Sequence, residues 1–225
     1  ALRSHQKAAK AQEDGVLDPE VVAVDGVTRD NGVRGDAKLE KLASLKPAFV
    51  RPHGTHTAGN SSFLTDGGAA CLLMSGTKAA QTGFTPKSVL RDWIFVSQDP
   101  KEELLLGPAY AMARLLHRQG LKLDDVGVVE LHEAFAGQVL SNLNALKDRD
   151  FCTRKAGVSD VVGEVDQERL NKWGGALAIG HPFGATGTRL VTTASNRLIA
   201  ENQRFALVSA CAAGGQGVAM LLERA

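Results

Sequence analysis

Three residues of types used in acid–base and acyl-transfer chemistry stand where predicted elements end. His132 follows the apolar run 126–131, His181 lies in a glycine-rich loop, and Cys211 closes the apolar run 205–211 before a turn with three glycines. Side chains at the ends of buried elements are held by a rigid scaffold and face a ligand. A thiol and two imidazoles in such places can transfer protons or act as nucleophiles.

Each of these residues also has a purely structural explanation. A cysteine that closes a buried strand is usually a small packed hydrophobe, and His132 could cap a helix or bond a carbonyl. A purely structural role is least convincing for His181, because Gly-His-Pro constrains the backbone around one titratable group. His53 and His56 in His-Gly-Thr-His suggest a metal site, but no third ligand lies nearby in the sequence, so we expect none.

The composition limits the classes of function. The chain has 225 residues, 44% of them hydrophobic, which suffices for one large domain or one and a half ordinary ones. Its 26 basic and 25 acidic residues give a net charge of +1, so we expect no nucleic-acid partner. Three cysteines fit a reducing compartment rather than a disulfide framework.

The sequence contains no membrane-crossing run and no sign of a secretory leader. No apolar run approaches the ~20 residues that span a bilayer. The first residues lack both an initiator Met and an apolar leader region. We interpret the start as the middle of a helix, and we therefore expect a fragment or a processed piece.

Apolar spacing predicts the elements that must position the candidate residues. Strands are expected at 21–24, 69–74, 89–96, 126–131, 205–211 and 218–222, and helices at 2–14, 39–45, 108–119, 135–146 and 188–200. Pro108 suits a first helical turn and Gly120 a helix end. Strands alternate with helices before a terminal hairpin, which predicts a layered α/β fold.

Four segments, in order along the chain, resemble the thiolase family. Residues 54–70 are similar to the stretch where the family's CoA-binding loop domain returns to the core. His-Glu-Ala-Phe at 132–135 is similar to its Asn-Glu-Ala-Phe motif, 174–182 to its histidine loop, and 211–217 to its C-terminal cysteine motif. The resemblance covers nearly the whole chain.

The resemblance implies a thiolase fold, a layered α-β-α arrangement with a mixed sheet, as the C-terminal part of a two-domain duplicated fold. Residues 1–64 would be the second part of the CoA-binding loop domain. Residues 65–85 would be the last strand and helix of the N-terminal domain, and residues 86–225 the C-terminal domain.

Two departures from the family pattern narrow the subfamily. His132 stands where most thiolases have Asn, and Ala213 where most have Gly. Together with segments 97–100 and 104–108, they resemble the long-chain 3-ketoacyl-CoA thiolases of fatty-acid oxidation multienzyme complexes. A larger departure is that no segment resembles the one with the family's nucleophilic cysteine, which we expect in an N-terminal half outside this sequence.

The resemblance implies thiolytic cleavage of 3-ketoacyl-CoA by CoA, with CoA as substrate and no cofactor. His181 would take the proton of the nucleophilic cysteine, and Cys211 would protonate the enolate and then deprotonate CoA. An ordinary thiol pKa of ~8.5 would suit that role. His132, through a held water, and the backbone N–H of Ala213 would serve oxyanions, and Ser62 would lie near the pantetheine.

The same resemblance implies partners and a location. It implies a homodimer, a hydratase/dehydrogenase α subunit and the mitochondrial matrix, with a bacterial cytoplasm as the alternative. It also leaves room for peripheral association with a membrane.

Three other interpretations compete with an active thiolase. A catalytically silent thiolase half could bind CoA or serve as a structural subunit. A ketoacyl synthase would share the fold, but those enzymes lack a second cysteine, so Cys211 argues against it. A Cys/His metal hydrolase is the most distant alternative.

Overall fold

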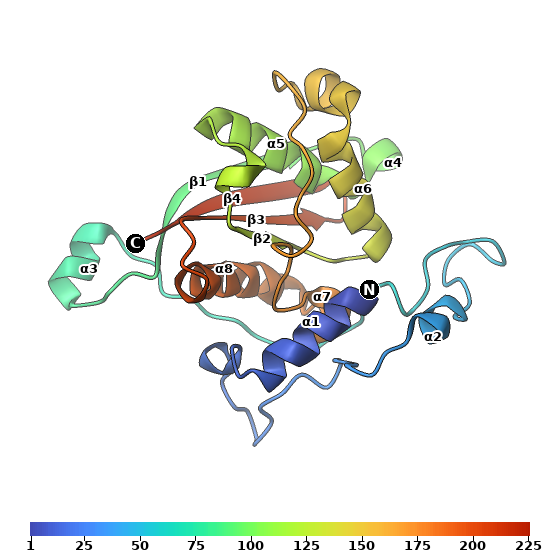
Figure 1. Cartoon of the computed structure of the whole chain (residues 1–225), viewed down its shortest axis with the longest axis horizontal. Coiled ribbons are helices and arrows are strands. Elements are labelled where there is room, and N and C mark those ends of the chain that lie inside the picture. Colours follow the sequence, from blue (N-terminus) through green and yellow to red (C-terminus); the bar gives the residue numbers. More distant parts are fainter.

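The computed structural model describes all 225 residues and contains one four-stranded mixed sheet. Its strands are β1 (Ser88–Ser97), β2 (Val128–Leu131), β3 (Phe205–Ala212) and β4 (Gln216–Arg224), in the order β1-β4-β3-β2. β4 is antiparallel to both of its neighbours, whereas β3 and β2 are parallel. The sheet lies between two helical layers (Figure 1), which confirms the predicted layered α/β fold.

The two faces of the sheet are covered by different helices. α5 (Gly107–Gln119) and α6 (Ala136–Lys147) lie on one face, and α8 (Phe183–Ala200) lies on the other (Figure 1). Alternate strand residues point to opposite faces. Val129, Leu131, Phe205, Leu207 and Leu221 therefore join the core below α5, and Val128, Ala206, Val208 and Leu222 pack against α8.

The remaining helices are short or lie outside these layers. They are α1 (Leu2–Glu13), α2 (Leu39–Ala43), α3 (Gly76–Thr82), α4 (Pro100–Glu103), α7 (Ala176–Ile179), two 3₁₀ turns (Asp18–Glu20 and Leu123–Asp125) and a π-helix (Phe151–Ala156). α5 carries Pro108 in its first turn and ends at the left-handed Gly120, as predicted. None of the helices combines the length and apolarity needed to span a membrane.

α8 begins at Phe183, five residues before the predicted start. Gly184 and Gly187 made that stretch look like loop, because glycine weakens a helix. The structure places both glycines inside the helix, and a Cβ at either position would meet no other atom.

Two predicted strands are absent. Residues 69–74 have no regular structure, and the side chains of Leu72 and Leu73 are 68% and 74% exposed. A strand needs a neighbour to satisfy its backbone groups, and no strand of this chain pairs with that segment. The predicted strand 21–24 is reduced to an isolated bridge between Val24 and Val27. The domain boundaries expected near residues 64 and 85 stay a prediction.

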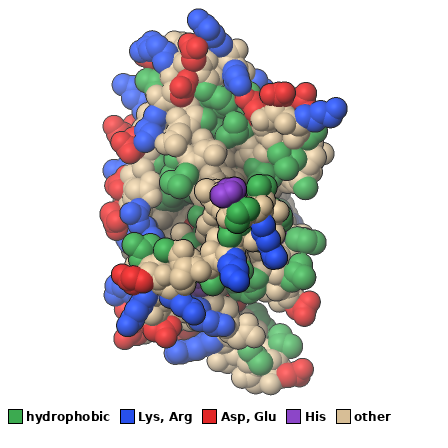
Figure 2. Space-filling model, turned by 90° about the vertical axis from the view of Figure 1, so that its right-hand side faces the viewer, with side chains coloured by type: hydrophobic (Ala, Val, Ile, Leu, Met, Phe, Trp, Pro, Cys, Tyr) green, Lys and Arg blue, Asp and Glu red, His purple; other side chains and the backbone are tan.

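Acidic and basic side chains are interspersed on the face that Figure 2 shows, with hydrophobic side chains between them. This mixture of signs agrees with the nearly balanced charge of the chain.

Candidate active site

His132 and Cys211 lie at one edge of the sheet, where two parallel strands end. Leu131 of β2 is in register with Ser209 of β3, and the N–H of His132 donates to the Ser209 carbonyl at 2.9 Å. Cys211 follows Ser209 by two residues. Because parallel strands have their carboxyl ends at the same edge, the fold places the imidazole and the thiol on the side where α/β sheets bind ligands.

His181 approaches the same edge from a loop after α7. Gly180 has a φ of 93°, and a Cβ at that position would overlap the Thr65 hydroxyl oxygen, so only glycine fits. The N–H of His181 donates to Thr65 Oγ1 at 3.1 Å. This contact fixes the backbone that carries the imidazole.

The rings of His132 and His181 lie against each other. Their centroids are 4.1 Å apart, with the planes inclined by 40°. His181 Nδ1 also forms a hydrogen bond of 2.7 Å with Thr186 Oγ1 of α8. These contacts do not include the Cys211 thiol, so the structure joins the two predicted histidines directly and brings Cys211 only to the same sheet edge.

The other two predicted site residues flank this edge. The N–H of Ser62 donates to the Ala134 carbonyl at 2.9 Å, which docks the segment around Ser62 beside the turn that follows His132. Ala213 lies exposed in the turn between β3 and β4, two residues after Cys211.

Burial sets the proton affinities of the three candidate groups. The side chain of His132 is 2% exposed, and burial lowers its pKa to about 3, with further lowering by His181 and Arg189. Burial, followed by Arg189, also lowers the pKa of His181. Both imidazoles are therefore neutral at pH 7.

The thiol behaves differently from the sequence-based expectation. Burial raises the pKa of Cys211 to about 11, so the ordinary thiol pKa assumed from the sequence is wrong for this environment. A thiol in this state holds its proton at pH 7 and can donate it to a strong base such as a carbanion.

Acid is expected to destabilise the protein through His132. Its pKa is about 3 in the folded state against 6.5 ordinarily, so between these values the unfolded state binds a proton that the folded state refuses. This contribution to stability is complete above pH 6.5 and is lost as pH falls towards 3. From pH 7 to 5 the loss should reach about 2 kcal/mol.

Denaturant unfolding at the two pH values measures this effect. His132→Asn should remove the part of the acid sensitivity that comes from His132, about 2 kcal/mol between these pH values, and leave the part that comes from His181, whose pKa is also lowered. His117→Asn, at an exposed position of α5, should leave it unchanged. Equal acid sensitivity in His132→Asn and the unsubstituted protein would show that His132 is not the titrating group.

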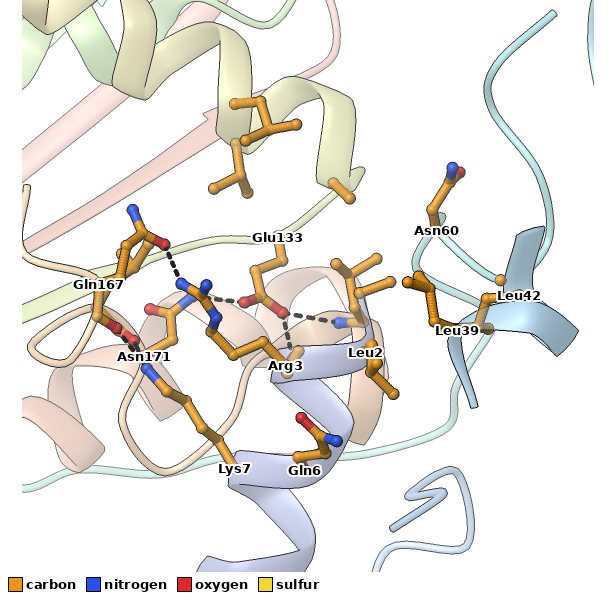
Figure 3. A pocket seen from close by; sticks show the side chains of 18 of the residues that line it. Leu2, Arg3, Gln6, Lys7, Leu39, Leu42, Asn60, Glu133, Gln167 and Asn171 are labelled. Atoms are coloured by element: carbon orange, nitrogen blue, oxygen red, sulfur yellow. Dashed lines mark hydrogen bonds between the residues drawn. The ribbon is translucent and has the colours of Figure 1, made fainter. Parts of the chain in front are cut away.

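Glu133, the residue after His132, connects the end of β2 to α1, to Asn171 and to α7 (Figure 3). Its Oε2 accepts from the Ser4 hydroxyl at 2.6 Å and from the Leu177 N–H at 3.2 Å, and its Oε1 accepts from Asn171 Nδ2 at 2.8 Å. A Cβ at Gly175 would overlap this carboxyl group. The sequence pointed to Glu133 only as a neighbour of His132, and its contacts with α1 were missed.

Asn171 takes the place of a further strand beside β2. It has a left-handed φ of 43°. Its side-chain oxygen accepts from the Leu131 N–H and its amide nitrogen donates to the Leu131 carbonyl, both at 2.8 Å. This pairing holds the last residue before His132 in an extended conformation. Nothing local in the sequence distinguishes Asn171 from a loop residue.

Glu133→Gln is expected to lower the free energy of unfolding by about 1–3 kcal/mol. All three neighbours of the carboxylate donate hydrogen bonds, so the amide nitrogen of glutamine would face a donor and leave buried groups unpaired. Chemical denaturation measures the loss. Glu164→Gln, at an exposed carboxylate paired with Lys147, is the control, and equal stability of both variants would contradict this interpretation.

A cavity of about 700 Å³ lies between α1, α2 and α6. Leu39, Leu42, Val139 and Leu143 form apolar parts of its wall, and Glu133 also lines it (Figure 3). His132, His181 and Cys211 are not among its lining residues. The cavity is therefore separate from the candidate catalytic groups.

The structure arranges no group of three or more His, Cys, Asp or Glu side chains suited to a metal ion. His56 packs edge-on against Phe135, with ring centroids 5.3 Å apart. This contact gives His56 a packing role.

Comparisons with known proteins relate nearly the whole chain to one protein family. The family model described as "Thiolase, C-terminal domain" matches residues 84–224, and "Thiolase, N-terminal domain" matches residues 1–77. The mitochondrial trifunctional enzyme subunit beta of Homo sapiens is 52% identical over 227 residues, covering 99% of this chain and 48% of that protein. A 3-ketoacyl-CoA thiolase of Yersinia enterocolitica is 44% identical over 229 residues, covering 99% and 52%.

A solved structure is similar as well. The Bacillus anthracis acetyl-CoA acetyltransferase matches with a TM-score of 0.82 and 33% sequence identity, covering 100% of this chain and 54% of that one. The chain thus spans about half the length of the relatives it matches.

Proposed function

Because the chain belongs to the thiolase family, we propose that the protein containing it cleaves long-chain 3-ketoacyl-CoA with CoA, as an acetyl-CoA C-acyltransferase of fatty-acid β-oxidation. The products are acetyl-CoA and an acyl-CoA shortened by two carbons. The observation that carries this proposal is the contact between the neutral rings of His132 and His181 at the sheet edge where Cys211 lies. The names of the 52% and 44% identical relatives support the substrate class.

The nucleophile is proposed to be a cysteine outside these 225 residues. Cys152 is fully buried and its thiol lies against the carbonyls of Ala145 and Leu146 in the core. Cys71 lies in the exposed segment 69–74. Neither is placed beside His132 and His181.

The reaction has two halves. The nucleophilic thiolate attacks C3 of the substrate after its proton has passed to His181. The electron pair of the C2–C3 bond then stays on C2, which leaves an acyl-enzyme and an acetyl-CoA enolate. Cys211 gives its thiol proton to C2 and regains a proton from the thiol of incoming CoA, whose sulfur takes the acyl group. The freed nucleophile takes its own proton back from His181.

Hydrogen-bond donors stabilise the oxygens that become charged in this scheme. His181, and a water held by His132, meet the enolate oxygen. The buried Nδ1 of His132 has no partner in the protein, which supports such a role. The backbone N–H of Ala213 serves the oxyanion at C3, and Ser62 lies along the path of the pantetheine.

Partners and location follow from the same relatives. We infer a homodimer, a hydratase/dehydrogenase α subunit as partner, and a mitochondrial matrix location, because the 52% identical relatives are mitochondrial trifunctional enzyme β subunits. A bacterial cytoplasm is the alternative that the Yersinia thiolase supports. We also propose that the protein associates peripherally with a membrane.

The deciding experiment is a thiolysis assay of the protein isolated from its source, after its intact mass has been measured. Loss of long-chain 3-ketoacyl-CoA that depends on CoA, in a protein larger than these 225 residues, is the expected result. CoA binding without turnover would instead support the silent thiolase half.

A further inference from the structure

The hydrogen bond between His181 and Thr186 has a direction, and the surroundings of Thr186 determine it. Thr186 is 3% exposed, and the only hydrogen bond of its hydroxyl group is the one to His181 Nδ1, at 2.7 Å. A threonine hydroxyl has one proton to donate. If Nδ1 were protonated and donated to this oxygen, the buried hydroxyl proton would have no acceptor, which is unfavourable.

We propose that Thr186 donates to Nδ1 and thereby holds His181 as the tautomer protonated at Nε2, so that the ring presents a hydrogen-bond donor to the substrate oxygen. This inference rests on the proposed thiolase reaction. It makes Thr186 a positioning residue that acts through His181.

The packing around the imidazole supports a fixed orientation. His132 lies on one side of the ring at 4.1 Å, and Phe183 meets it at 5.2 Å, between centroids. The backbone N–H of His181 is held by Thr65. With Nδ1 directed at the first turns of α8, Nε2 is the nitrogen left to face a ligand.

This assignment ranks the two roles proposed for His181. A ring that carries its proton on Nε2 is ready to donate to the enolate oxygen. Taking the nucleophile's proton at Nε2 requires the other tautomer, whose population is about 10- to 100-fold lower because the Thr186 proton then lacks an acceptor. The resting site is therefore prepared for oxyanion stabilisation.

Nitrogen NMR of the full-length protein, labelled with ¹⁵N in histidine, tests the tautomer directly. His181 is expected to carry its proton on Nε2 and to keep it there in Thr186→Ser, which retains the hydroxyl. In Thr186→Val the Nδ1 signal should move to the value of an imidazole nitrogen without a donor. Thr193→Val is the matched control, because Thr193 is also buried on α8 but bonds Glu20.

Thiolysis by the same variants gives the second readout. Thr186→Val should lower kcat about 10- to 100-fold with little change in KM, since the donor is needed mainly in the transition state. Thr186→Ser should stay within about threefold of the unsubstituted protein, and so should Thr193→Val. A merely structural role would lower stability equally in both valine variants and leave the His181 nitrogen signals alone.

A His181 protonated on Nδ1 in the unsubstituted protein would overturn the inference, whether or not thiolysis is observed. So would a kcat that rises in Thr186→Val. An Nε2-protonated ring in a protein without thiolysis would support the tautomer and reject the proposed reaction.

Discussion

Replacing Cys211 by alanine in the full-length protein is expected to reduce long-chain thiolysis by at least about 100-fold. The expectation follows from its place two residues after Ser209, at the sheet edge where His132 also lies, and from its protonated state at neutral pH. In the proposed reaction this thiol gives its proton to the enolate carbon, and alanine cannot replace it in that step. The rate of 3-ketoacyl-CoA loss at saturating CoA measures the effect.

The control for this variant is Cys71→Ala, since Cys71 is exposed outside the site. It should leave the rate unchanged. His181→Ala should cost a factor similar to that of Cys211→Ala, because it removes a donor to the enolate oxygen. Near-normal turnover in either site variant would remove that residue from the mechanism.

Arg197→Ala is expected to cost about 3–5 kcal/mol of unfolding free energy. The side chains of Arg197 and Glu130 are completely buried and joined at 2.6 Å, between α8 and β2. Arg189 is the other cation near this carboxylate, at 3.8 Å. Removal of the Arg197 guanidinium would leave a buried acidic group with one distant partner. Urea unfolding monitored by circular dichroism measures the loss.

A matched surface variant separates the effect of burying an ion pair from the effect of losing a charge. Arg91→Ala removes an ion pair with Glu223 between partly exposed side chains, and should cost less than about 1 kcal/mol. The double variant Glu130→Leu, Arg197→Met should recover much of the stability lost in Arg197→Ala. Both buried charges are then replaced by apolar side chains, so no charge is left buried without its partner. An Arg197→Ala protein as stable as Arg91→Ala would contradict the argument.

The sequence predicts most of the sheet because its strands are continuous apolar runs. The segments 89–96, 205–211 and 218–222 all lie within strands of the structure. Segment 69–74 has the same apolar character, and the prediction fails there because a strand also depends on a neighbour. Apolar character is local, whereas strand pairing is not.

The candidate site likewise contains residues that a local sequence pattern reveals and residues that depend on distant contacts. The motifs around His132, His181 and Cys211 were visible because unusual residue types stand at the ends of predicted elements. Thr186 and Ser4 were missed because nothing near them in the sequence indicates which residues they contact. Ser4 contacts Gly175, 171 positions later, and such a contact leaves no local pattern.

The Asn171 side chain also determines how the sheet can grow. β2 is one of its two edge strands, and an open edge invites pairing with another chain and aggregation. Here Leu131 is occupied on both its N–H and its carbonyl by Asn171, and Val129 is bonded by the backbone of Arg169 and Asn171. Loop residues rather than another strand thus occupy the backbone groups of β2 and close that edge to strand addition. Only β1 offers an open edge at which this sheet can be extended.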